Sequence, residues 1–136
     1  MDEINDYDCD GYRPFHHAIL ANSISRARDL MRLGALINAP TESDDGALVL
    51  TCRALNDDEA AEWIPVLLEW GAEIIDRDRT GRTPLHHACE RGLVKTTAAL
   101  LAGGADPFFK DGYGKKPADY ATSEAMRSLF SKKTAT

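Results

Sequence analysis

A short pattern of Asp, Gly and Pro recurs along the chain and constrains its fold more than any other feature. In three places an Asp is followed by Gly three residues later and by Pro three residues after that, beginning at Asp8, Asp78 and Asp111. A Gly-Ala pair also recurs, at 34–35, 71–72 and 104–105. Recurrence at fixed offsets indicates repeats of one structural unit, and such units stack because one alone cannot bury its apolar face.

The best-preserved copy of this unit spans Asp78 to Asp111. Its first four residues suit a tight turn, because Gly adopts positive φ easily and Asp bonds to nearby backbone. Thr83-Pro84 begins a helix, since Thr is a good N-cap and Pro is tolerated in the first turn. Gly92 ends this helix, and a second one over 94–101 ends at Gly103-Gly104. Each copy is therefore predicted to be a helix–turn–helix unit.

The fragments RPFHHA (13–18), TPLHHA (83–88) and KPADYA (116–121) are versions of one motif. In this motif the sequence resembles the ankyrin-repeat family, whose pattern is T-P-L-H-x-A on a period of about 33 residues. The resemblance implies an all-α solenoid of about four stacked repeats with short hairpin-like fingers. We place an acidic lead at 1–7, repeats at about 8–39, 40–76, 77–110 and 111–131, and a polar tail at 132–136.

Repeat 2 is degenerate, and its register is ambiguous by one residue. We align residues 47–56 with 83–92, so that Ala47, Leu48 and Leu50 replace Thr83, Pro84 and His86. About three extra residues fall near Asp57–Glu59, which we predict to form a loop. Because Pro is tolerated only in the first turn of a helix, Pro65 predicts that the second helix starts at about Trp63. Trp63 and Trp70 are expected to pack in the core, although exposed binding anchors are the alternative.

The paired histidines and the cysteines invite a catalytic or metal-binding interpretation, which their spacing does not support. Adjacent helical residues face different ways, so each His pair should give one inward and one outward ring. The resemblance implies that His16 and His86 hydrogen-bond backbone in adjoining turns, and that His17 and His87 flank the concave side. Cys89 lies on the inward stripe and is expected to be a buried thiol. We predict no catalytic residue, no metal site and no cofactor.

The net charge of −6 is distributed unevenly. Residues 1–76 hold 16 acidic and 5 basic residues, a net charge of −11, whereas residues 77–136 hold 6 acidic and 11 basic residues, a net charge of +5. The overall negative charge argues against nucleic acid as the partner, because phosphate neutralisation dominates such binding. No apolar run approaches the length of a membrane helix, and the acidic start is unlike a signal peptide. We expect an acidic cytoplasmic protein without a membrane segment.

The resemblance implies a concave face, made of finger tips and first-helix surfaces, that binds a folded protein. The contact positions of the family fall on Tyr7, Asp10, Tyr12, Arg77, Arg79, Arg82, Glu90, Arg91, Lys110, Tyr113 and Lys115, and in repeat 2 on Asp44, Asp45 and Leu55. Because arginine bonds carboxylates with two parallel N–H groups, an acidic patch on the partner should face repeats 3 and 4.

A chain of this size without a second domain is expected to act as a small inhibitor or adaptor that masks its partner. An immunity-type protein, an effector or a virus-encoded antagonist would fit. The alternatives are a structural or oligomerisation subunit, and a nucleic-acid-binding protein that uses the arginines of repeat 3.

Overall fold

The computed structural model describes residues 11–38, 41, 45–74 and 77–134, with side chains described up to residue 130. Its secondary structure is helical throughout these residues, as the resemblance implies: α1 Pro14–Leu20, α2 Ile24–Arg32, α3 Ala47–Ala54, α4 Asp57–Glu69, α5 Pro84–Arg91, α6 Val94–Ala102, the 3-10 helix η2 Pro117–Tyr120 and α7 Glu124–Thr134. The predicted residues Tyr7, Asp10 and Asp44 lie outside the described part.

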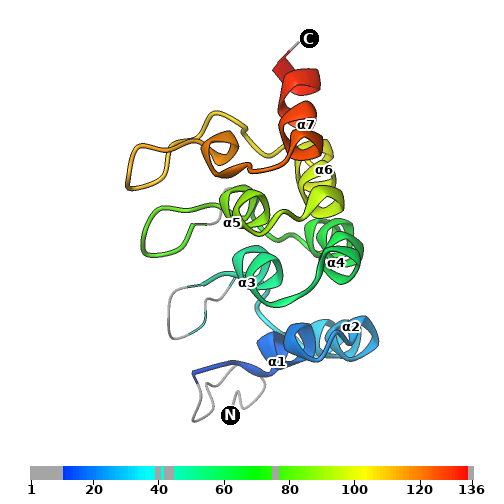
Figure 1. Ribbon diagram of the computed structural model, residues 1–136. Helices are drawn as coiled ribbons and strands as arrows, with labels where there is room; N and C mark the ends of the chain where they lie inside the picture. Colours follow the sequence, from blue (N-terminus) through cyan, green and yellow to red (C-terminus); the bar gives the residue numbers. More distant parts are fainter. Residues whose placement is uncertain (1–10, 39–40, 42–44, 75–76, 135–136) are drawn as a thin grey trace.

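The helices form two layers of a short stack (Figure 1). One layer holds α1, α3, α5 and η2, and the other holds α2, α4, α6 and α7. Within the layers α3 packs on α5 and α4 packs on α6. The loops between repeats project from the first layer, on the left in Figure 1. We call residues 77–82 finger 3 and residues 110–115 finger 4. The predicted solenoid of helix–turn–helix units with projecting fingers is confirmed.

The helix ends of repeat 3 follow from the residues that the sequence places there. The Thr83 hydroxyl accepts the backbone N–H of His86, and Gly92 closes α5 in the left-handed conformation with φ 73°. After α6, Gly104 has φ 101°, and the Ala105 N–H donates to the carbonyl of Leu100 at 3.0 Å. This is a Schellman ending, which Gly adopts without a Cβ penalty.

The core runs the length of the stack between the two layers. Leu85, Trp63, Ile64 and Met126 are buried in it, as is Cys89. Trp70 is partly buried and packs on the same core. The predictions that the tryptophans pack internally and that Cys89 is a buried thiol are confirmed. Burial raises the pKa of Cys89 to about 12, so the thiol is un-ionised near neutral pH.

The predicted register of repeat 2 is wrong by one residue. Helices α3 and α5 both have 8 residues, and their N-caps are Gly46 and Thr83. Gly46 therefore replaces Thr83, and Val49 replaces the motif histidine. The helix begins without a side-chain cap, as expected. Every residue from Ala47 to Cys52 is buried, so packing holds α3 in place of a cap.

The predicted start of the second helix in repeat 2 is also wrong. Helix α4 begins at Asp57, six residues before Trp63, and Asn56 and Glu59 cap it reciprocally. Its acidic first turn is favourable at the positive end of the helix dipole. Pro65 lies inside the helix on an exposed position, so the neighbouring buried side chains must offset its lost hydrogen bond. With 13 residues against 9 in α6, the insertion adds about one helical turn.

Repeat 4 differs from the other repeats in both of its helices. The first is reduced to a single 3-10 turn, η2, in which Asp119 takes the place of the motif histidine and accepts the Lys116 N–H at 2.8 Å. The second helix, α7, continues to Thr134, past the predicted boundary at 131. Met126 and Phe130 face the core as expected, and they cover the end of the stack.

Candidate functional site

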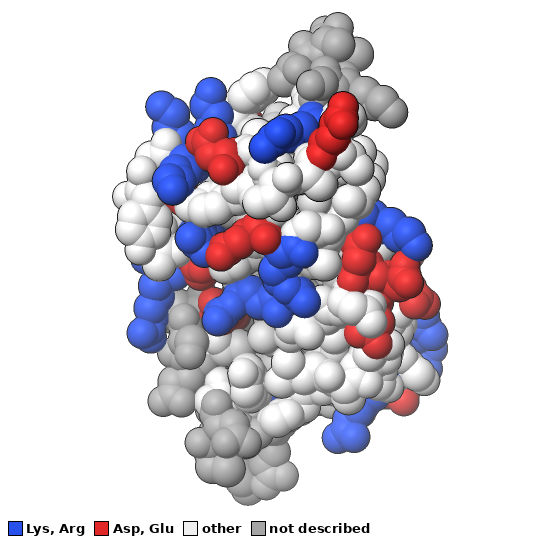
Figure 2. Space-filling view, in the orientation of Figure 1, with Lys and Arg blue, Asp and Glu red and all other residues white. Residues whose placement is uncertain are grey.

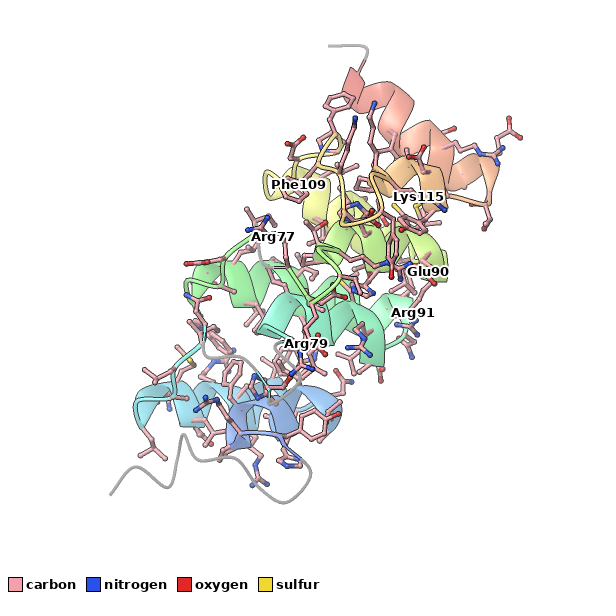
Figure 3. The ribbon with its side chains drawn as sticks, turned by 90° about the vertical axis from the view of Figure 1, so that its left-hand side faces the viewer. Arg77, Arg79, Glu90, Arg91, Phe109 and Lys115 are labelled. Carbon is pink, nitrogen blue, oxygen red and sulfur yellow. The ribbon has the colours of Figure 1, made fainter. Side chains whose placement is uncertain are left out.

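A groove of about 470 Å³ lies on the inner side of the stack, between finger 3 and helices α3 and α5. In Figure 3 the finger side of the molecule faces the reader, with Arg77, Arg79 and Lys115 labelled on it. Every lining residue is charged or polar: Asp45, Arg53, Asp78, Arg79, Thr80, Arg82, His87, Glu90 and Arg91.

Asp78 holds finger 3 in shape. Its Oδ1 accepts the N–H of Thr80 at 2.9 Å, the Thr80 hydroxyl at 2.7 Å and the N–H of Arg82 at 3.1 Å. Its Oδ2 lies 2.8 Å from Nε2 of His87. Burial alone would raise the pKa of Asp78, but the hydrogen bonds from Thr80, His87 and Arg82 lower it overall. The aspartate of the repeat motif is therefore ionised and is the acceptor around which the finger turns.

His87 is buried, which corrects the prediction that the second ring of each pair faces outward. The reason is Asp78, because finger 3 folds over α5 and the carboxylate meets the ring. Burial lowers the pKa of His87, so the imidazole is neutral near pH 7 and Nε2–H donates to Asp78. His17, at the same position in repeat 1, is half-buried, and its ring meets Tyr12 edge-on at 5.5 Å.

His86 links repeat 3 to finger 4, as the resemblance implies. Its Nδ1 accepts the N–H of Thr83 at 3.1 Å, which places the ring proton on Nε2. Nε2 lies 2.9 Å from the carbonyl oxygen of Lys115 and donates to it. Burial lowers the pKa of His86, which keeps the ring neutral and able to make both bonds. In repeat 1, Nδ1 of His16 accepts the N–H of Arg13 in the same way, at 3.2 Å.

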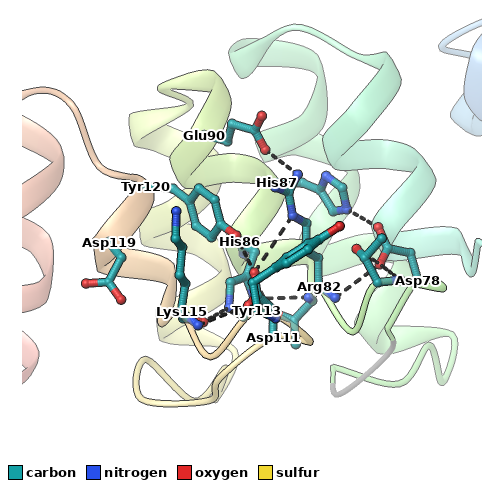
Figure 4. A network of polar contacts seen from close by, with 12 residues as sticks. Asp78, Arg82, His86, His87, Glu90, Asp111, Tyr113, Lys115, Asp119 and Tyr120 are labelled. Atoms are coloured by element: carbon teal, nitrogen blue, oxygen red, sulfur yellow. Dashed lines mark hydrogen bonds and ion pairs between the residues drawn. The ribbon is translucent and has the colours of Figure 1, made fainter.

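Asp111 organises finger 4 as Asp78 organises finger 3 (Figure 4). Its Oδ1 accepts the backbone N–H of Tyr113 at 2.8 Å and of Lys115 at 3.0 Å, and its Oδ2 accepts the Tyr120 hydroxyl. The two fingers touch directly, because the Gly112 N–H donates to the Thr80 carbonyl at 2.8 Å. A Cβ on Gly112 would lie 2.5 Å from that oxygen, so this contact requires glycine. Fingers 3 and 4 therefore form one continuous wall beside the groove.

Two of the predicted binding arginines are built into the stack itself. Arg82 is half-buried, donates to Glu90 at 2.6 Å, and lies with its guanidinium carbon 4.8 Å from the centroid of the Tyr120 ring. Arg91 donates to the carbonyls of Cys52 at 2.8 Å and Leu55 at 2.6 Å. Both arginines connect neighbouring repeats, so each has a structural role that the sequence analysis did not predict.

The other predicted cations lie at the exposed finger tips. Arg77, Arg79, Lys110 and Lys115 are all exposed. The guanidinium carbon of Arg77 lies 5.4 Å from the centroid of the Phe109 ring, an arrangement that favours a defined rotamer. Tyr113 is 67% exposed beside them. The structure thus separates Arg82 and Arg91, which are bonded to groups of neighbouring repeats, from exposed finger-tip residues that can reach a partner.

One ion pair of the groove was missed by the sequence interpretation. Arg53 NH1 donates to Oδ2 of Asp45, and with the corrected register these residues match Glu90 and Arg82. Repeats 2 and 3 thus carry the same pair at the same eight-residue spacing with the charges exchanged. The eight-residue spacing between an acidic and a basic residue was the sequence signal that could have revealed this ion pair. Leu55, a predicted contact, is buried and packs in the core.

The described part of the chain contains no group of three or more His, Cys, Asp or Glu side chains placed to hold a metal ion. Within the same residues, no helix combines the length and the apolar character that crossing a bilayer requires.

Comparison with known proteins places the repeat in a family. The ankyrin repeat model matches residues 80–112. The chain is 36% identical over 99 residues to the nuclear factor NF-kappa-B p105 subunit of Gallus gallus, covering 72% of this chain and 10% of that protein. It is 34% identical over 97 residues to protein phosphatase 1 regulatory subunit 27 of Mus musculus, covering 69% of this chain and 63% of that protein.

The fold has a solved counterpart. The ankyrin repeat domain of Bcl-3, a member of the IkappaB protein family, superposes with a TM-score of 0.85 over 94% of this chain and 55% of that one, at 23% sequence identity. The chain spans between 10% and 63% of the length of the two relatives above. The repeat motif, the sequence relatives and the superposed stack agree, and the chain belongs to the ankyrin-repeat family.

Proposed function

We propose that this chain binds a folded protein through its concave face and masks the surface that it covers, as a small inhibitor or adaptor. Ankyrin repeats are protein–protein interaction modules, and their fold is a non-catalytic scaffold. One relative is by name a regulatory subunit of a phosphatase, which fits a role exerted by binding. The free thiols of Cys52 and Cys89 suit a reducing compartment, and we infer a cytoplasmic location.

The observation that carries this proposal is the charged groove with its wall of fingers. Arg82 and Arg91 are held by Glu90 and by backbone carbonyls, so the groove is rigid before a partner arrives. Rigid sites lose less entropy on binding than flexible ones. The exposed contact set then comprises Arg77, Arg79, Lys110, Tyr113 and Lys115. Further predicted contacts are Tyr12 in repeat 1, and Tyr7 and Asp10, which lie outside the described residues.

The charge distribution indicates an acidic patch on the partner. Figure 2 shows basic side chains with a few acidic ones among them over the finger side of the molecule, and a cluster of acidic side chains, flanked by basic ones, over α4 on the opposite side. Attraction between the basic fingers and an acidic surface would orient the approaching partner and speed association. Arginine and tyrosine are also the residue types that most often dominate binding energy at interfaces.

Charge reversal at the finger tip tests this assignment. The double variant Arg77→Glu/Arg79→Glu should weaken partner binding by more than about 2 kcal/mol, roughly a 30-fold rise in Kd. The measurement is quantitative mass spectrometry of proteins that the wild-type and variant chains retain from native cytosol, followed by calorimetry with the retained protein.

The matched control is Arg28→Glu/Arg32→Glu, which makes the same change in net charge on exposed positions of α2. This control should bind like the wild type. A partner lost from the α2 variant but retained by the finger variant would refute the proposed face.

A further inference from the structure

A second hollow, of about 240 Å³, lies on the concave side between repeats 1 and 2. It adjoins the groove described above, because Asp45 and Arg53 line both. Its remaining wall is mainly apolar, with the Tyr12 ring and the side chains of Leu20 and Leu50. A long side chain with an apolar stem and a polar head would match such a lining.

Asp45 has an unmet hydrogen-bonding requirement in this hollow. The residue is 4% exposed, and its Oδ1 is buried without a hydrogen-bond partner among the described residues. Its Oδ2 accepts from Arg53, and its backbone N–H donates to the Thr41 hydroxyl at 3.2 Å. A buried carboxylate oxygen without a donor is costly, and burial raises the pKa of Asp45 accordingly. The site therefore lacks a donor to Oδ1.

The Asp45 carboxylate already binds one guanidinium, that of Arg53, which indicates the kind of group that suits this site. This guanidinium meets Oδ2, while the Arg53 side chain remains 49% exposed at the rim. The Asp45 side chain of this pair is only 6% exposed, so the pair opens to solvent on its Arg53 side, where a second guanidinium could compete with Arg53 for the carboxylate. A guanidinium also stacks on aromatic faces and presents several donors in one plane, which a lysine ammonium does not. Tyr12 supplies the aromatic ring on the same wall.

We propose that this hollow binds an arginine side chain of the partner protein, with its stem along Leu20 and Leu50 and its guanidinium between the Tyr12 ring and Oδ1 of Asp45. The inference rests on the proposed concave interface and adds a specificity element to it. The partner would place an arginine over repeats 1 and 2, and acidic residues over fingers 3 and 4. Arg53 is the internal competitor for this site.

The probe is N-acetyl-arginine amide, titrated into the full chain and followed by two-dimensional ¹H–¹⁵N NMR. We expect the amide signals of Tyr12, Leu20 and Leu50 to shift in a saturable way. N-acetyl-citrulline amide, which has the same shape without the charge, should not reproduce these shifts. Equal shifts with both probes would overturn the proposal.

Two variants should change the affinity for the arginine probe in opposite directions. Asp45→Asn should weaken binding of the arginine probe about tenfold, because it removes the charge that the guanidinium meets. Arg53→Gln should tighten binding about two- to fivefold, because it removes the competing cation. Glu62→Gln removes one exposed negative charge on α4 and should leave binding unchanged.

Unchanged affinity in Asp45→Asn, or weaker affinity in Arg53→Gln, would contradict the assignment. If Asp45→Asn fails to fold, Tyr12→Leu provides the same test, with loss of the probe shifts expected and their retention contradicting the proposal. Because the probe is a single capped amino acid, failure here leaves the finger-tip contacts of the proposed function untouched.

Discussion

Replacement of Leu85 by Ala should lower the free energy of unfolding by about 2–5 kcal/mol, the range for large-to-small changes in a core. Leu85 is 1% exposed and lies on α5, which packs against α3, α6 and η2. The shorter side chain leaves a cavity between α5 and the three elements packed on it, and these elements cannot all move in to fill the cavity. In a stacked array stability is the sum of repeat and interface terms, so a defect in the central repeat affects both of its interfaces.

Urea unfolding followed by far-ultraviolet circular dichroism measures this effect. Leu33→Ala is the control, since Leu33 is 71% exposed and its truncation should change stability by no more than about 0.5 kcal/mol. A midpoint for Leu85→Ala that equals the wild-type value would show that repeat 3 is not packed as described.

Asp57→Ala should have the second largest effect on stability, a loss of roughly 2 kcal/mol. Helix α6 begins at Val94, and its N-cap residue Leu93 provides no side-chain hydrogen bond. Asp57, from the preceding repeat, supplies the cap instead. Its Oδ1 accepts the Thr96 N–H and hydroxyl, both at 2.9 Å, and its Oδ2 accepts the Lys95 N–H at 3.1 Å. Removing the carboxylate leaves the backbone N–H groups of Lys95 and Thr96 unpaired and loosens the contact between α4 and α6, while the Thr96 hydroxyl keeps only the Asp57 carbonyl at 3.1 Å.

Asp58→Ala is the matched control for this prediction. Asp58 is the next residue of the same helix, and it pairs with Lys95 at 2.6 Å, but both side chains are largely exposed. Exposed pairs contribute about 0–1 kcal/mol, so this variant should unfold close to the wild-type midpoint. Equal losses from the two variants would indicate that general charge, and not the cap on α6, explains the role of Asp57.

The parts of the fold predicted correctly are those in which local residues decide the structure. Thr83-Pro84 begins α5, Gly92 ends it, and the motif Asp of fingers 3 and 4 accepts hydrogen bonds from the next few backbone N–H groups. These signals act within a few residues and can be read from sequence. The predicted register of repeat 2 was wrong by one residue because Gly46 and Val49 stand where the motif has Thr and His. No local residue pattern therefore fixed the position of this helix.

The errors at the site arise from contacts between residues far apart in the chain. Arg91 bonds carbonyls at the end of α3, and Asp57 caps α6, across separations of 36 to 39 residues. No local sequence pattern marks either pairing. The sequence analysis therefore predicted Arg91 as a partner contact and Asp57 as part of a loop. The predicted start of α4 failed for a related reason, because buried neighbours allow Pro65 inside the helix.

Hydrogen–deuterium exchange, measured on the chain alone and with the protein that it retains from cytosol, shows directly whether the concave face binds the partner. We expect partner binding to slow exchange in finger 3, residues 77–82, and finger 4, residues 110–115, while exchange in α2, α4 and α6 is unchanged. These three helices form the opposite layer of the stack and serve as internal controls. Protection confined to α2, α4 and α6, with fingers 3 and 4 exchanging as in the free chain, would contradict binding through the concave face.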